Sequence, residues 1–169
     1  MINVSSLRAL PLTLCCTLCQ SATLTGQVVG VADGDTITVL AASKSQHKIR
    51  LSGIDAPEKA QPFGQRSKQS LSDLVFGKTV RIDIGKTDRY GREVGKVLVD
   101  GIDANLVQVK RGMAWHYKAY QSEQSPDDRL TYAVAEKNAA AARLGLWHDI
   151  APVAPWEWRH PLKTLPQNQ

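Results

Sequence analysis

Short stretches of alternating apolar residues, each closed by a turn signal, dominate residues 25–101 and constrain the fold more than any other feature. Their sequences are TGQVVGV, TITVL, HKIRLSGID, KTVRIDIG and VGKVLVDG. β-branched residues with a period of two predict strands with one buried face. In the third stretch, Ile49 and Leu51 share one face, and Arg50 lies on the other.

Helical spacing interrupts the strands once and then follows them. Residues 63–76 carry an apolar stripe of Leu71, Leu74 and Val75, and Gly77 marks the end of this helix. A second helix is expected with Ile102, Leu106, Val109 and Met113 buried. A third is expected over about residues 127–144, with these residues facing inward: Leu130, Ala133, Val134, Ala140, Ala141 and Leu144. Five short strands with a helix after the third predict an α+β protein, a five-stranded barrel of the oligonucleotide-binding (OB-fold) kind.

The N-terminus differs from the rest of the chain. Arg8 precedes an apolar run over residues 9–19, and small residues follow, a pattern typical of a signal peptide over residues 1–23. We therefore expect a secreted or periplasmic protein without stable membrane association once the leader is removed. A disordered leader, or translation starting further downstream, is the alternative.

All three cysteines, Cys15, Cys16 and Cys19, lie in this leader. Its removal would exclude a disulfide framework and a cysteine-based zinc site from the mature domain. That domain is expected over residues 26–149. A Pro-rich tail over residues 150–169 should pack partly through Trp156 and Trp158 and then fray.

Charge gives a weak indication of the partner. The chain has 21 Lys and Arg against 16 Asp and Glu, a formal net charge of +5. This excess is compatible with a polyanion such as nucleic acid, although many soluble proteins are mildly basic.

Acidic residues cluster at two strand ends. In DGDT, Asp33 is explained by a turn, but Asp35 opens a strand, where Asp is disfavoured. In RLSGIDAPE, Arg50, Asp55 and Glu58 lie within nine residues. Oxygen ligands of this kind suit calcium or magnesium, although one such cluster alone is usually solvated.

A third cluster, TDRYGREVG, places Arg92 in a turn between two strands. Arg50 and Arg92 could bind one phosphate through forked donors, although either alone would be read as a surface arginine. The four histidines are scattered without ligand spacing, which argues against zinc or a Ser-His-Asp triad. Trp147 is expected to pack the last helix rather than to bind substrate.

Taken together, the segments VVGVADGDTITV, IRLSGIDAPE, FGQRSKQSL, DRYGREVGKVLVDGIDANLVQVKRGMA and AVAEKNAAAARLGLWHD resemble the thermonuclease, or staphylococcal-nuclease-like, family over about residues 26–149. The resemblance implies a five-stranded OB-fold barrel with three helices. It also implies calcium-dependent endonucleolytic cleavage of DNA and RNA that leaves a 3′-phosphate.

The resemblance assigns roles residue by residue. The implied calcium ligands are the carboxylates of Asp35 and Asp55 and the backbone carbonyl of Ala56, where the family also has Thr. The implied catalytic set is Arg50, Glu58 and Arg92. Whether Glu58 acts as a base or orients the attacking water is left open by the sequence.

The family also implies substrate contacts from Arg89, Tyr90 and Tyr120. Lys118 departs from the pattern, since the family's best-known member has Tyr there; Tyr117 or Trp115 is a candidate to compensate. The departure leaves base preference open. The expectation is a monomeric, calcium-dependent endonuclease acting on DNA and RNA. The alternatives are a non-catalytic OB-fold protein that binds nucleic acid and an interaction module that needs no metal.

Overall fold

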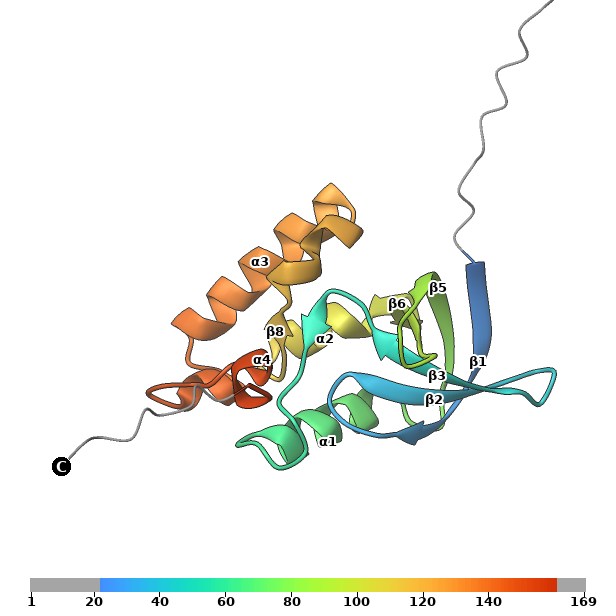
Figure 1. Cartoon of the computed structure of the whole chain (residues 1–169), viewed down its shortest axis with the longest axis horizontal. Coiled ribbons are helices and arrows are strands. Elements are labelled where there is room, and N and C mark those ends of the chain that lie inside the picture. The colour runs from blue at the N-terminus through green and yellow to red at the C-terminus, as the bar shows by residue number, and fades with distance from the viewer. Residues whose placement is uncertain (1–21, 161–169) are drawn as a thin grey trace, which may run out of the picture.

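The computed structural model describes residues 22–160. Its centre is a closed barrel of five strands, which gather on one side of the molecule in Figure 1. These are β1 (Ala22–Val31), β2 (Thr36–Ala41), β3 (Gln46–Leu51), β5 (Thr79–Thr87) and β6 (Glu93–Val99). The order β3-β2-β1-β5-β6 is antiparallel throughout, and a parallel pairing of β3 with β6 closes the barrel. The predicted α+β OB-fold barrel is confirmed.

Shorter elements complete the fold. Two-residue strands lie outside the barrel proper: β4 (Ile54–Asp55) pairs with β8 (Trp115–His116), and β7 (Ile102–Asp103) extends the edge of β6. The helices are α1 (Gly64–Val75), α2 (Ala104–Lys110), α3 (Pro126–Ala141), α4 (Pro155–Trp158) and the 3₁₀ turns η1 (Lys118–Glu123) and η2 (Gly145–His148). α2 lies between the barrel and α3, because it contacts both β6 and α3 (Figure 1).

The core follows the predicted alternation. Ile49 and Leu51 are buried while Arg50 faces the other way, and Leu71 and Val75 of α1 pack into the same cluster. Burying alternate β-branched side chains is the main term that stabilises such a barrel.

The predicted inward faces of the later helices are partly wrong. Leu130 of α3 is 68% exposed, and Val134 and Leu144 are also exposed; the buried residues are Tyr132, Ala135, Glu136 and Ala139. Ile102 is exposed in β7, outside α2. Hydrophobicity alone selected the wrong face of α3, because Glu136 is buried with partners of its own: it accepts from the His116 amide and from Lys118.

The two ends of the described chain concern the predicted leader and the predicted packing of the C-terminal tail. The predicted leader lies almost wholly outside the described residues, but β1 starts at Ala22, which pairs with Ile84. In the tail, Trp156 packs against Tyr117 and Trp115 as expected, whereas Trp158 is 42% exposed. Across residues 22–160, none of the helices has the length and apolar character needed to cross a bilayer.

Candidate active site

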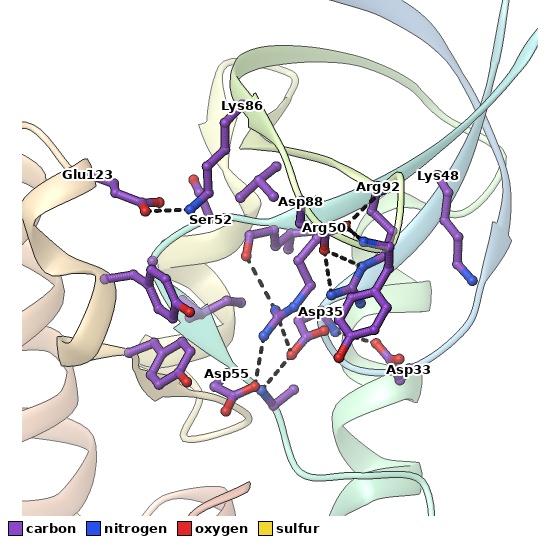
Figure 2. A pocket seen from close by; sticks show the side chains of 18 of the residues that line it. Asp33, Asp35, Lys48, Arg50, Ser52, Asp55, Lys86, Asp88, Arg92 and Glu123 are labelled. Atoms are coloured by element: carbon purple, nitrogen blue, oxygen red, sulfur yellow. Dashed lines mark hydrogen bonds and ion pairs between the residues drawn. The ribbon is translucent and has the colours of Figure 1, made fainter. Parts of the chain in front are cut away.

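One pocket of ≈ 770 Å³ collects the predicted site residues. It is lined by the turn before β2, the ends of β3 and β4, the β5–β6 turn, η1 and Arg159 after α4. Figure 2 shows Asp35, Arg50 and Asp55 pointing toward one another in this pocket. Segments more than a hundred residues apart therefore meet at one mouth of the barrel.

Asp35 is fixed at the start of β2. Its amide donates to Asp33 Oδ1 (3.1 Å), its carbonyl accepts from Leu51 N (2.8 Å), and its Oδ2 accepts from Ala56 N (2.7 Å). Burial raises the pKa of this carboxyl to about 7, against the opposing charge of Arg50. Asp35 is thus a buried acid whose charged form is disfavoured even beside Arg50.

Gly34 makes this placement possible. A Cβ there would lie 1.8 Å from Ser67 Oγ and 2.7 Å from Ala56 Cβ, and the Gly34 carbonyl accepts from Gln108 Nε2 (2.9 Å). The turn therefore packs directly on α1 and on Ala56, the residue that follows the second carboxylate. The sequence showed a turn glycine here but not this close contact.

Arg50 joins the two predicted metal carboxylates. Its Nη1 lies 2.8 Å from Asp35 Oδ2, and its Nη2 lies 2.7 Å from Asp55 Oδ1 (Figure 2). Asp55 is only 1% exposed and is held in β4 by its pairing with Trp115. One guanidinium spans both groups, so the carboxylates are close enough to share a cation.

Glu58 and Asp55 share a second arginine, Arg159. Its Nη1 lies 2.6 Å from Glu58 Oε1, and its Nη2 lies 2.7 Å from Asp55 Oδ2. Burial would lower the pKa of Arg159, but hydrogen bonds to the two carboxylates raise it. Sequence reasoning missed this residue.

Arg92 lines the same pocket but faces a different carboxylate. Its Nε and Nη2 each lie 2.8 Å from Asp88 Oδ2. Burial alone would raise the pKa of Asp88, but hydrogen bonds from the amide and side chain of Arg92 hold it below its usual value. Within residues 22–160, Arg92 makes no ion pair with Asp35 or Asp55, so the structure braces it in its turn rather than against the carboxylates.

Aromatic side chains line the rim. Tyr90 is 68% exposed, and the guanidiniums of Arg89 and Arg92 lie 5.0 and 5.4 Å from its ring centroid. Tyr120 packs against Tyr117 at 5.0 Å. Tyr117 lines the pocket, so of the two candidates to replace the missing tyrosine it is the one placed to do so.

Lys118 itself turns away from the pocket and pairs with Glu136. The departure from the family pattern thus leaves a lysine engaged in a structural ion pair.

The donor set fits a hard divalent cation. In the described part of the chain, no group of three or more His, Cys, Asp or Glu side chains is arranged to hold a metal. The set expected here is instead two carboxylates and a carbonyl, all oxygen, which leaves other positions for water and substrate, as calcium prefers. The two acids already share a cationic group, which supports that fit.

Comparison with known proteins identifies the family. A family model described as "Staphylococcal nuclease homologue" matches residues 48–149. An "Uncharacterized endonuclease" of Haemophilus influenzae is 44% identical over 141 residues, 83% of this chain and 76% of that protein.

The chain belongs to the staphylococcal nuclease homologue family. Another relative, a "Micrococcal nuclease" of Shigella flexneri, is 40% identical over 147 residues, 82% of each chain. A "Probable staphylococcal-like nuclease CAN1" of Oryza sativa is 44% identical over 114 residues, a third of that longer protein. Membership in the nuclease family supports an endonuclease function for this chain. The family match ends at residue 149, so Arg159 lies beyond it.

Proposed function

We propose that this protein is a calcium-dependent endonuclease that hydrolyses phosphodiester bonds of DNA and RNA with little sequence specificity and leaves 3′-phosphate ends. The observation that carries the proposal is the bridge from Arg50 to Asp35 and Asp55. It gathers two buried carboxylates at one point, in a pocket that Glu58 and Arg92 also line.

In this proposal Asp35, Asp55 and the Ala56 carbonyl hold calcium. Bound there, calcium would neutralise phosphate charge and orient the substrate. Arg50 and Arg92 supply forked donors to phosphate oxygens, where charge grows in the transition state, each worth about 3 kcal/mol. Glu58 accepts a proton from the attacking water or holds that water in line.

The rim explains why sequence preference should be weak. Tyr90, Tyr117 and Tyr120 offer aromatic faces, and every base can stack on such a face. Arg89 and Lys86 add positive charge along the same edge. Stacking and phosphate contacts do not distinguish the sugars, so both DNA and RNA are expected substrates.

The proposal includes a monomer that acts outside the cytoplasm once the N-terminal leader has been removed. The competing class is an OB-fold protein that binds nucleic acid without cleaving it, since fold alone does not establish function. A pure binder has no use for Glu58 held beside Asp55.

The test is cleavage of supercoiled plasmid and of a fluorescent single-stranded oligonucleotide by the purified protein, with calcium or with EGTA. Degradation only with calcium, and product ends that phosphatase treatment converts to 3′-hydroxyls, are expected. Binding without cleavage under both conditions would contradict the proposal.

Two variants sharpen this test. Glu58→Gln should lower kcat by at least ~100-fold while oligonucleotide binding persists, and Asp35→Asn should weaken calcium binding. The matched controls are Glu157→Gln, the same change at an exposed position, and Asp73→Asn on the exposed side of α1. Equal losses in variants and controls would refute the assigned roles.

A further inference from the structure

The segment after the family match, residues 153–159, is fastened to the domain at several points. Gln61 Nε2 donates to the Val153 carbonyl (2.6 Å), and Ala154 and Pro155 are buried. Trp156 stacks on Tyr117, with centroids 5.3 Å apart and planes 9° apart. A segment held in this way presents its next residues in a fixed direction.

α4 turns the chain so that Arg159 reaches the pocket. The Arg159 amide donates to the Pro155 carbonyl (3.0 Å), which completes the turn. Its guanidinium then meets Glu58 and Asp55 at 2.6 and 2.7 Å, and Nη1 lies 3.4 Å from the second Asp55 oxygen. Among the described residues, Arg159 is the only hydrogen-bond partner of the Glu58 carboxylate.

We propose that Arg159 is a positioning residue of the active site: it orients the Glu58 carboxylate relative to Asp55. The inference rests on the proposed function, in which Glu58 acts on the attacking water. Glu58 is 39% exposed and lies in a loop, so without a partner its carboxylate would sample several rotamers. A planar guanidinium fork holds two carboxylates in one fixed geometry, which the rotatable ammonium of a lysine on its flexible stem does less well.

The same contact has an opposite consequence for ion binding. Arg159 neutralises Asp55, a proposed calcium ligand, and therefore competes with a cation for it. Removing Arg159 should strengthen calcium binding while it weakens turnover. A residue that only held the fold together would weaken both.

The experiment uses the full chain with Arg159→Ala and Arg159→Lys, and with Arg81→Ala as a control of equal charge change on β5. Arg159→Ala should lower kcat by roughly 10- to 100-fold at saturating calcium, with a smaller change in KM. Arg159→Lys should recover part of the loss. Titration calorimetry with calcium alone should show a Kd lower than that of the wild type. Arg81→Ala should match the wild type in kcat and calcium Kd.

A double-mutant cycle with Glu58→Gln decides whether Arg159 acts through Glu58. The Arg159→Ala effect on kcat should largely vanish when Glu58 is already Gln. If the two losses multiply, the positioning role is overturned. It is also overturned if Arg159→Ala is as fast as the wild type or faster at saturating calcium, and a faster variant would indicate that the contact is inhibitory. If the wild type cleaves and Glu58→Gln does not while Arg159→Ala is normal, this inference fails and the proposed function stands. An inactive wild type removes both.

Discussion

Replacing Arg50 with Ala tests the arrangement at the centre of the site. Arg50 is mostly buried and is the shared cation between Asp35 and Asp55, whose side chains are 8% and 1% exposed. Breaking a buried ion pair costs about 3–5 kcal/mol, because the remaining charge is left without a partner. Arg159 still pairs with Asp55, and Asp35 can take up a proton, so we expect the lower end, about 3 kcal/mol at pH 7. For a domain of this size that corresponds to a melting temperature lower by ~10 °C.

The expected loss depends on pH through Asp35. Its pKa is raised to about 7 in the folded protein, so the folded state binds a proton that the unfolded state releases above pH 3.8. The stability contributed by this group is therefore complete below pH 3.8 and lost as pH rises through 7. Without Arg50 the buried carboxylate has less compensation, so the Arg50→Ala defect should grow from pH 6 to pH 9.

The assay is thermal unfolding followed by circular dichroism, in EGTA and in calcium. Calcium should raise the melting temperature of Arg50→Ala more than that of the wild type, because the ion replaces the missing charge. Arg81→Ala, whose ion pair with Asp83 is exposed, should change stability by less than ~1 kcal/mol. An Arg50→Ala protein that melts within 2–3 °C (roughly 1 kcal/mol) of the wild type in EGTA would refute the reasoning.

Three further outcomes are expected. Gly34→Ala should lower the free energy of unfolding by ~1–3 kcal/mol in urea titrations, because its Cβ would overlap Ser67; Gly85→Ala, where the nearest atom is 3.9 Å away, should not. Calcium affinity measured by calorimetry should weaken by about tenfold per pH unit well below pH 7, because Asp35 must lose its proton to bind the ion; an unchanged Kd at pH 5.5 would contradict this. Tyr132→Phe should cost ~1–2 kcal/mol in the same urea titrations through the lost 2.8 Å hydrogen bond to Asp103, and an unchanged midpoint would show that this bond contributes little.

The sequence predicted the barrel well because its strands are half-buried. In each strand apolar and polar side chains alternate, so only one face of the sheet can be buried, as at Ile49, Arg50 and Leu51. The inward face of α3 was not predictable in this way. Its buried face includes Tyr132 and Glu136. Their polar atoms are tolerated in the interior because they are hydrogen-bonded: the Tyr132 hydroxyl donates to Asp103, and Glu136 accepts from the His116 amide.

In the site too, residues in local sequence motifs were predictable and a long-range contact was not. Asp35, Arg50, Asp55 and Glu58 come from short motifs at strand ends, and the structure places all four in one pocket. Arg159 lies 101 positions from Glu58, in a Pro-rich segment without periodicity. No local pattern can reveal a contact across that separation, because it depends on where Trp156 docks.

The parallel pairing of β3 with β6 has a consequence for when the protein can act. In that register Arg50 lies opposite Val94, two residues after Arg92, so the two arginines proposed to bind phosphate lie on either side of one seam. Until β3 pairs with β6, nothing in the strand register holds the two arginines on either side of this seam. On the proposed mechanism, a chain in which β3 and β6 have not paired should therefore not cleave nucleic acid. If the expected leader directs export of the unfolded chain, the proposed nuclease activity would arise only after the chain has left the cytoplasm and folded.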